Sequence, residues 1–432
     1  MSKVKKGYKM TELGEIPTQW EIKRLCDISE INPKKEIIED DKDVSFIAME
    51  DVSNQGWIIK NNVRTYGEVK KGYTAFKNND VLLAKITPCF ENGKKVIATK
   101  LINEVGFGST EFHVLRAKKN ESVPSYIYYI ISSNNFIQKA KANMTGSAGQ
   151  KRVPTEFLKE YMITTPPLEE QQKISLILSL LDEKIENTDK LIEKTKELKK
   201  GLMQRLLTKG IGHERFKDAE IGMMPEEWKI KRLIDIADKS DRYSFTGGPF
   251  GSNLKSCDYT EVGVRVIQLQ NIGDGYFNNE STIYTSEKKA DELRSCNIYP
   301  GNIIIAKMAE PVARACKIPC IEERYLMCSD GIRISVDESE NNVDYIKYSI
   351  NSKYFRINAI ANSTGSTRLR IGLNELRNLP IIIPPLYEQV KIASILLSID
   401  KKIDQYKSKK QKLQELKEGL MQKLLTGKIR VQ

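Results

Sequence analysis

The spacing of apolar residues predicts two long helices, one in the middle of the chain and one at its end. Residues 166–208 and 384–426 each open with two prolines and then repeat apolar side chains at alternating spacings of four and three. That spacing is typical of a coiled-coil seam. The seam positions are Ile174, Leu178, Leu181, Ile185 and Ile192 in the first run, and Ile392, Leu396, Ile399, Ile403, Tyr406 and Leu413 in the second. Each run predicts a rod of about 60 Å at 1.5 Å per residue.

The segments before each rod have a different pattern, with short apolar runs that end near glycines. We expect four of these runs to be strands: residues 46–52 and 80–85 before the first rod, and residues 266–272 and 302–307 before the second. Helical patterns follow at 126–141 and 345–360. The sequence therefore predicts two α/β blocks, each followed by a long helix.

Internal repetition explains why the pattern occurs twice. Residues 166–208 align with residues 384–426 without a gap, and 23 of the 43 positions are identical. Residues 13–28 align with residues 221–236, with 9 identities in 16 positions. The chain is therefore two half-molecules in tandem. The predicted segments are a first domain at 1–165, a central helix at 166–212, a second domain at 213–383 and a C-terminal helix at 384–432.

Connectivity suggests how the two helices pair. The first helix leads from the first block to the second, so an antiparallel second helix returns the chain toward its start. We expect a mixed α/β fold, a pseudo-twofold tandem repeat with two globular domains held apart by a two-helix antiparallel coiled coil. A coiled coil that joins separate chains is the alternative, because heptads alone do not specify partners. Gly201 and Gly419 share one phase of GLMQ(R/K)LLT and fit either a frayed helix end or close approach by another helix or subunit.

Composition narrows the class of protein. No apolar run approaches the roughly 18 residues of a membrane span, and no secretory signal follows the first lysines, so we expect a cytoplasmic location. Seven cysteines scattered over 432 residues indicate reduced thiols. The net charge of +12 is weak evidence for nucleic acid, because residues 213–383 carry one more acidic than basic residue. That block does hold 12 arginines against 4 in residues 1–165, and arginine suits bidentate reading of guanine.

Signals for catalysis and metal binding are absent from the sequence. It has no Walker A loop, no GxSxG and no HExxH, and two histidines are few for imidazole chemistry. A zinc site at Cys296, Cys316, Cys320 and Cys328 lacks the usual CxxC spacing, so buried free thiols are the favoured interpretation. We therefore predict no catalytic and no metal-ligating residue.

Three further features have structural interpretations. His113 lies in an alternating strand pattern and is expected to be structural. Trp20 and Trp228, each within WxIKRL, are expected to anchor a core. The glycine-rich segment at 247–256, GGPFGSNLKS, lacks the lysine and serine of a P-loop and fits either a shaped recognition loop or a plain turn.

Taken in order, these duplicated motifs resemble the specificity subunits of type I restriction-modification systems. The resemblance covers the whole chain. It rests on (L/I)GxxPxxW at 13 and 221, PPLxEQxxI at 166 and 384, GLMQ(K/R)LLT at 201 and 419, and a TGS loop before each helix. GSTEFHVL in the first block and GGPFGSNLKSxDY in the second also resemble segments of target recognition domains.

The resemblance implies a non-catalytic DNA reader. Each target recognition domain would bind one half of a bipartite double-stranded DNA sequence, while the helices space the domains and bind two methyltransferase subunits. Restriction subunits would add translocation and cleavage. The chain itself would bind no cofactor, and S-adenosylmethionine and ATP with Mg would belong to the partner subunits. No membrane partner is implied.

The family also suggests where such contacts lie in this sequence. For DNA we nominate Lys151 and Arg152 in the first block and Arg368 and Arg370 in the second, with Ser252, Asn253 and Lys255 as second choices. For subunit binding we nominate Gly201, Leu202, Met203, Gly419, Leu420 and Met421.

Two other functions remain as hypotheses. A stand-alone DNA-modifying enzyme would transfer methyl groups or cut DNA without partners. A coiled-coil adaptor with no DNA role would bind partners without DNA sequence selectivity.

Overall fold

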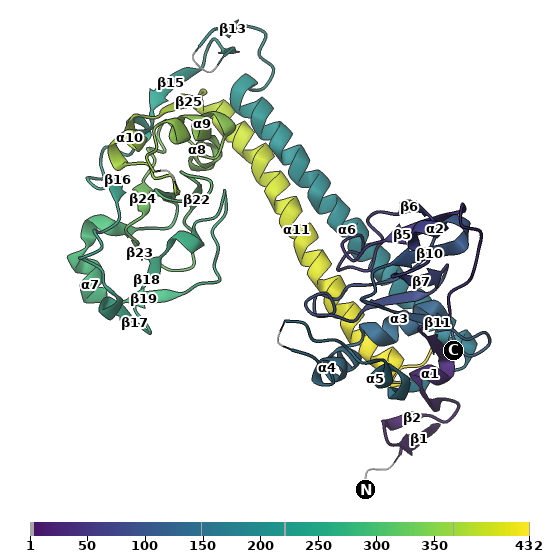
Figure 1. Ribbon diagram of the computed structural model, residues 1–432. Coiled ribbons are helices and arrows are strands. Elements are labelled where there is room, and N and C mark those ends of the chain that lie inside the picture. The colour runs from purple at the N-terminus through teal and green to yellow at the C-terminus, as the bar shows by residue number, and fades with distance from the viewer. Residues whose placement is uncertain (1–3, 148, 220–221, 366, 432) are drawn as a thin grey trace. The chain divides into compact units, whose positions relative to one another are not determined.

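The computed structural model describes residues 4–147, 149–219, 222–365 and 367–431, and its packing divides the chain into two units. Unit 1 comprises residues 1–189 and 408–432, and unit 2 comprises residues 190–407. The two long helices, α6 (Leu168–Lys209) and α11 (Leu386–Leu425), are each shared between the units (Figure 1). Unit 1 therefore contains one globular block, the start of α6 and the end of α11. Unit 2 contains the other block, the end of α6 and the start of α11.

Unit 1 contains two four-stranded sheets, with strand orders β6-β5-β10-β7 and β4-β11-β8-β9. Strand β10 is parallel to β5, and the other neighbours are antiparallel. Two smaller pairs, β1-β2 and β3-β12, complete the unit. The strands are β1 (Tyr8–Thr11), β2 (Gly14–Pro17), β3 (Glu21–Arg24), β4 (Ser29–Ile31), β5 (Asp43–Ile47), β6 (Asn62–Thr65), β7 (Thr74–Lys77), β8 (Val81–Ala84), β9 (Lys95–Ile97), β10 (Val105–Gly108), β11 (Phe112–Ala117) and β12 (Met162–Thr165).

Unit 2 repeats this topology with one additional edge strand, β17. Its strand orders are β16-β24-β21-β22 and β17-β19-β18-β23-β20, with the pairs β13-β14 and β15-β25. Its parallel pair, β18 with β23, corresponds to β5 with β10. The strands are β13 (Phe216–Lys217), β14 (Met224–Pro225), β15 (Lys229–Arg232), β16 (Phe245–Gly247), β17 (Tyr259–Thr260), β18 (Val264–Ile267), β19 (Ile283–Thr285), β20 (Asn297–Ile298), β21 (Ile303–Ala306), β22 (Ala315–Lys317), β23 (Tyr325–Met327), β24 (Gly331–Ile334) and β25 (Pro380–Ile383).

Short helices cover the sheets and connect them. In unit 1 they are α1 (Leu25–Ile28), α2 (Tyr66–Val69), α3 (Pro124–Ser132), α4 (Asn134–Ala142) and α5 (Thr155–Glu160), with the 3-10 turn η1 (Ile102–Glu104). In unit 2 they are α7 (Glu287–Glu292), α8 (Val343–Ile350), α9 (Lys353–Ala361) and α10 (Leu373–Asn378), with the 3-10 turns η2 (Leu233–Ile236), η3 (Ser256–Asp258), η4 (Leu269–Asn271) and η5 (Arg294–Cys296). The mixed α/β class predicted from the sequence is confirmed.

The predicted elements need two corrections of detail. The strand predicted at 46–52 is Asp43–Ile47, and the one predicted at 266–272 is Val264–Ile267, because turns begin directly after them. Each predicted helix at 126–141 and 345–360 is two helices. The break comes where Ser133 or Ser352 accepts a hydrogen bond from the backbone of a new helix, acting as its N-cap.

The coiled-coil seam is formed within the chain, and its positions are buried or half-buried. In unit 1 the start of α6 lies beside the end of α11, joined by the ion pair Lys410–Asp189 at 2.6 Å. In unit 2 the end of α6 lies beside the start of α11, joined by Lys199–Asp400 at 2.6 Å. The two helices are therefore antiparallel, as predicted. Ile174 and Leu178 pack into the core of unit 1, and Ile392 and Leu396 do the same in unit 2, so the seam also holds each globular block.

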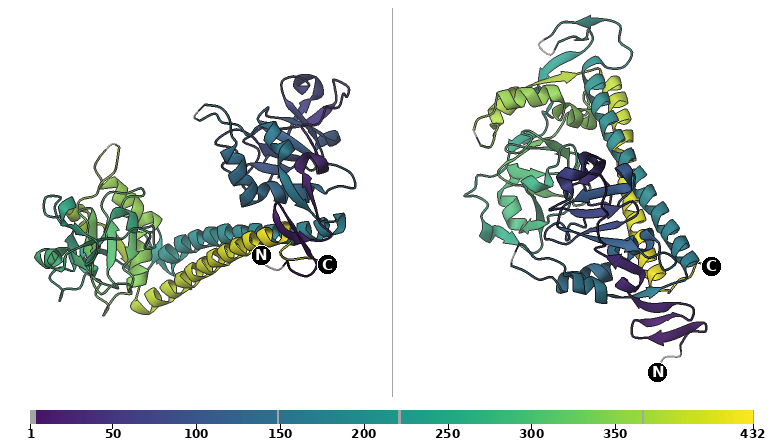
Figure 2. Two further views of the ribbon diagram at one scale, coloured as in Figure 1. Left: turned by 90° about the horizontal axis from the view of Figure 1, so that it is seen from below. Right: turned by 45° about the vertical axis from the view of Figure 1, so that its right-hand side comes forward.

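Both ends of the chain lie in unit 1 (Figure 2). There the Tyr8 hydroxyl donates a hydrogen bond to the Gly427 carbonyl oxygen at 2.9 Å. No helix among the described residues is long and apolar enough to cross a membrane.

Candidate nucleic-acid interface

The segments that carry the two TGS motifs, 145–152 and 364–370, each close by backbone pairing of the first threonine with the last arginine, and we call each a hairpin. Ala148 and Ser366, which belong to these segments, lie outside the described residues. In unit 1, Thr145 and Arg152 exchange backbone hydrogen bonds of 3.0 and 2.8 Å. In unit 2, Thr364 and Arg370 do the same at 2.9 Å in both directions. Both hairpins pair with the chain just beyond the end of an inner strand, because Arg152 bridges to Ile86 after β8, and Arg370 bridges to Met308 after β21.

A carboxylate holds the last arginine of each hairpin. Arg152 donates to both oxygens of Glu111, with an Nη2–Oε1 distance of 2.8 Å, and Arg370 donates to Asp330 at 2.9 Å. The hydrogen bond from Arg152 lowers the pKa of the Glu111 carboxyl below its usual range. Both arginine side chains stay about half exposed. Each guanidinium is thus oriented by the protein while part of it faces solvent.

The other two nominated hairpin residues, Lys151 and Arg368, face solvent. Both are exposed, and their side chains make no hydrogen bond or ion pair with any described residue. Lys151 and Arg368 do not occupy equivalent positions. Lys151 directly precedes Arg152, whereas Arg368 lies two residues before Arg370. The hairpins therefore offer different exposed groups from one backbone frame.

The glycine-rich segment of unit 2 lies beside its hairpin. The Gly248 amide donates to the Gly331 carbonyl at 2.8 Å, one residue from Asp330. A side chain at Gly247 would come within 3.0 Å of the Lys307 Nζ, and the Lys307 carbonyl accepts from Ile371. Burial, followed by the charge of Arg370, lowers the pKa of Lys307. Ser252, Asn253 and Lys255 are all exposed on this segment, which includes a turn at 251–253.

His113 supports the unit 1 hairpin from within the block. Its ring is buried and lies 2.8 Å from the carbonyl oxygen of Val153, the residue after Arg152. Burial lowers the pKa of the imidazole. The structural role predicted for His113 is confirmed.

The cysteine prediction is correct only in part. Cys296 and Cys316 are buried, and burial raises the pKa of the Cys316 thiol to about 12. Cys320, however, is exposed, because β22 ends at Lys317 and the chain turns before it. No group of three or more histidine, cysteine or acidic residues among the described residues is placed to hold a metal ion.

The tryptophan anchors are confirmed, and the structure gives each a partner that the sequence did not predict. Trp20 and Trp228 are both 0% exposed, and their indole nitrogens donate to Glu170 at 2.9 Å and Glu388 at 2.8 Å. These glutamates come from the PPLxEQ segment. The repeat alignment contained the signal, since both members of each pair lie in duplicated motifs.

A second duplicated contact ties each block to both helices. In unit 1, Tyr129 donates to Asp182 at 2.9 Å, and Asp182 pairs with Lys417. In unit 2, Tyr348 donates to Asp400 at 2.6 Å, and Asp400 pairs with Lys199. In each unit the lysine comes from the helix of the other half-molecule.

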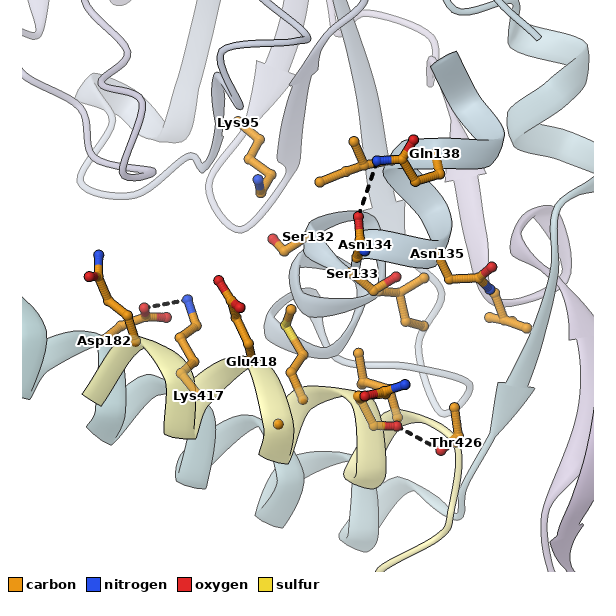
Figure 3. Close-up of a pocket in the computed structure, with 18 of the residues that line it drawn as sticks. Lys95, Ser132, Ser133, Asn134, Asn135, Gln138, Asp182, Lys417, Glu418 and Thr426 are labelled. Atoms are coloured by element: carbon orange, nitrogen blue, oxygen red, sulfur yellow. Dashed lines mark hydrogen bonds and ion pairs between the residues drawn. The ribbon is translucent and has the colours of Figure 1, made fainter. Parts of the chain in front are cut away.

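A cavity of about 1530 Å³ lies in unit 1 next to the Asp182–Lys417 pair (Figure 3). Lys95 points into it, and burial lowers the pKa of its ammonium to about 8. None of the residues nominated for DNA lines this cavity, whereas Gly419 and Met421 do. The cavity is therefore separate from the hairpin.

The residues nominated for subunit binding are in two environments. A Cβ atom added at Gly201 or Gly419 would lie more than 4 Å from the other described parts of the chain, so both glycines face open space. Met421 is buried in the core of unit 1, Leu420 packs on that core, and Leu202 and Met203 pack on the core of unit 2. The leucines and methionines thus hold helix ends to globular blocks.

Comparison with known proteins gives a consistent result over both units. The family described as type I restriction modification DNA specificity domain matches residues 17–197 and 225–417. The type I restriction enzyme EcoAI specificity subunit of Escherichia coli is 34% identical over 244 residues, which cover 54% of this chain but 38% of that protein. The putative MjaX specificity subunit of Methanocaldococcus jannaschii is 28% identical over 446 residues, covering 98% of this chain and 97% of that protein.

Solved structures share the fold. A chain from a study of assembly and conformational transition in the type I R-M system has a TM-score of 0.60 at 19% identity, covering 96% of this chain and 99% of that one. The type I restriction-modification S subunit from M. genitalium has a TM-score of 0.55 at 18% identity, covering 94% and 96%.

Proposed function

Since the chain belongs to the type I restriction modification DNA specificity family, we propose that each of its two units binds one half of a bipartite DNA target. The observation that carries this proposal is the duplicated hairpin. Both units hold an arginine in the same way, Arg152 on Glu111 and Arg370 on Asp330, while the exposed residues beside it differ. A shared backbone arrangement that carries different exposed side chains suits two domains that bind different DNA sequences.

The chemistry of the hairpins fits duplex DNA. A guanidinium held at one edge by a carboxylate keeps other N–H groups free for a phosphate or the O6 and N7 of guanine. The exposed side chains of Lys151 and Arg368 add positive charge, with no carboxylate of the described residues paired to either. Since half or more of the hydrogen bonds in such interfaces go to phosphate and sugar, the hairpins serve both positioning and reading.

We also propose that the helices dock two methyltransferase subunits, one in each unit. Exposed apolar residues on the first half of each long helix support this: Leu176 and Leu180 in unit 1, Val390 and Leu397 in unit 2. In unit 2 they border a cavity of about 360 Å³ together with Ala393. The open surface at Gly201 and Gly419 allows close approach by a partner helix.

The chemistry of modification is proposed to lie with the partners. The relatives are named as specificity subunits of restriction enzymes, and the sequence carries no recognisable catalytic motif. S-adenosylmethionine, and ATP with Mg, are accordingly expected to bind to methyltransferase and restriction subunits, and this chain is expected to transfer no methyl group alone.

Sequence-selective DNA binding across a salt series tests the function. The chain with methyltransferase subunits is expected to prefer a bipartite duplex over random DNA by a ratio that survives added salt, although both affinities fall. Equal affinity for all sequences would support the coiled-coil adaptor. Methyl transfer by the purified chain without partners would support the stand-alone enzyme.

A further inference from the structure

Phe250 has the largest exposed fraction of the exposed aromatic side chains in the described part of the chain, 82%. It lies in the glycine-rich loop between β16 and η3, within a run of four exposed residues, 250–253. Single exposed apolar residues are common on protein surfaces. Phe250 differs from these because the loop on both sides of it is fixed.

The N-terminal side of the loop is pinned to β24 and the turn before it. A side chain on Gly248 would come within 1.7 Å of the Cys328 carbonyl oxygen, so only glycine fits there. The Gly248 amide donates to Gly331 at 2.8 Å, and Pro249 is buried. The backbone therefore leaves the sheet at a fixed point directly before Phe250.

The C-terminal side is held by a small apolar core. Leu254 packs against the cluster that contains Val264, Val266 and Leu326. Between the anchors, the Asn253 amide donates to the Phe250 carbonyl at 2.8 Å and closes a turn. The aromatic ring is thus presented by the first residue of a hydrogen-bonded turn, and Ser252 and Asn253 are the last two residues of that turn.

Charge around the root of this loop favours a polyanion. Lys307 lies against Gly247, Arg370 extends from the neighbouring hairpin, and Arg368 and Lys255 are exposed. The only carboxylate paired to Arg370 among the described residues is Asp330. A protein partner that buried Phe250 would have to match this positive surface, whereas DNA does so with its phosphates.

We propose that Phe250 is an apolar wedge that inserts at a base step of the DNA half-site bound by unit 2. This inference rests on the proposed function. Phenylalanine is one of the side chains that proteins insert between base pairs, where the cost of partial unstacking is offset by the new contacts. Ser252 and Asn253, in the same turn, then face base edges or phosphates at the opened step.

The wedge is tested with 2-aminopurine placed in turn at each step of the two half-sites, in duplexes bound by the chain with its methyltransferase subunits. Binding is expected to raise fluorescence at one step of the unit 2 half-site other than the base that a methyltransferase flips out of the stack, and Phe250→Ala is expected to abolish that rise alone. Loss of a base contact of this kind weakens binding about 5- to 150-fold. Phe250→Leu should retain most of the affinity, because leucine can also act as a wedge.

Val262→Ala is the matched control, since Val262 is 79% exposed in the same unit but lies in another loop. It is expected to leave affinity and fluorescence unchanged. The proposal that Phe250 inserts at a base step is wrong if Phe250→Ala binds the full target as tightly as the unchanged chain and keeps the fluorescence rise. It is also wrong if Phe250→Ala loses the methyltransferase subunits, because Phe250 is then a protein anchor. Failure of the proposed function is seen separately, as an unchanged chain that prefers no DNA sequence.

Discussion

The two units share a buried frame and differ in the groups they expose. Trp20 and Trp228, each bonded to a glutamate, and Arg152 and Arg370, each bonded to a carboxylate, occur in both. The glycine-rich loop with Phe250 is confined to unit 2. Under the proposed function, we expect the groups that both units keep to hold the fold or to contact features common to all DNA, such as phosphates. We expect sequence reading to belong to the groups that differ.

The residues nominated for DNA fall into two groups. Arg152 and Arg370 occupy equivalent positions, so they are better suited to positioning each hairpin on the DNA backbone than to distinguishing two sequences. Lys151 and Arg368 are exposed and not equivalent. We expect them, with Ser252 and Asn253, to contribute most of the difference in specificity between the units.

The largest effect is expected at the tryptophan anchors. Trp20→Ala and Trp228→Ala should each destabilise their own unit by about 3–5 kcal/mol, because a buried ring is lost and a buried glutamate loses a donor. Urea unfolding measures this. Trp57→Ala is the control, since Trp57 is 45% exposed and its loss should cost at most about 0.5 kcal/mol. A large loss in only one unit would contradict the shared frame.

Substitution of Arg368 should separate the two readers. Arg368→Ala is expected to weaken binding to duplexes that carry the unit 2 half-site by about 5- to 150-fold, which corresponds to about 1–3 kcal/mol for a base contact. Duplexes changed only in the unit 1 half-site should still be discriminated as before. Competition binding with each half-site altered in turn measures this, and equal loss of discrimination at both halves would be evidence against independent readers.

Substituting alanine for Gly210 and for Gly201 should change stability in opposite directions. Gly210 has a φ of +64°, and a side chain there would come within 2.6 Å of the Trp228 ring. Gly210→Ala should therefore destabilise unit 2 by about 1–3 kcal/mol. Gly201→Ala lies inside α6 with open space around it and should stabilise by up to about 1 kcal/mol. Thermal unfolding of the two variants measures both changes.

The Gly201→Ala variant also distinguishes the two interpretations of that glycine, a frayed helix end and close approach by a partner helix. A frayed helix end predicts unchanged affinity for methyltransferase subunits, whereas close approach by a partner helix predicts a weaker complex. Titration calorimetry with the methyltransferase subunit, alongside thermal unfolding, separates the two outcomes.

The smallest effect is expected from acid at the unit 1 hairpin. Arg152 lowers the pKa of Glu111. The contribution of the Arg152–Glu111 pair to stability is therefore complete above the usual glutamate pKa of about 4.3. It is lost as the pH falls through the lower pKa that Glu111 has in the folded protein. The Arg152 amide donates to Thr145 at 2.8 Å. Its hydrogen exchange, compared with the rate of an unprotected amide at the same pH, should speed up in that range. Glu111→Gln should remove the pH dependence, and its persistence in that variant would rule out this pair as the cause.

The sequence predicts the duplicated architecture because the signals are local. Heptad spacing, the paired prolines and the ungapped repeat at 166–208 and 384–426 depend on residues close in the chain. The antiparallel pairing follows from connectivity. Strand ends and the helix breaks at Ser133 and Ser352 escape prediction, since capping by one serine is a weak signal inside an apolar pattern.

The candidate site is less predictable because its contacts are distant in sequence. Glu111 lies 41 residues from Arg152, and Asp330 lies 40 residues from Arg370. No local pattern links them. The expectation that Cys320 is buried is wrong for a related reason, since a turn after Lys317 carries it out of the strand. Comparing the two halves position by position is the signal that could have identified these pairs.

The map of methylated bases in the DNA of a cell that produces this chain with its methyltransferase partner tests the central claim most directly. Two readers on one frame predict a single bipartite motif, with two different half-sites and a fixed gap. A continuous motif, two half-sites with a variable gap, or no sequence preference would contradict the account.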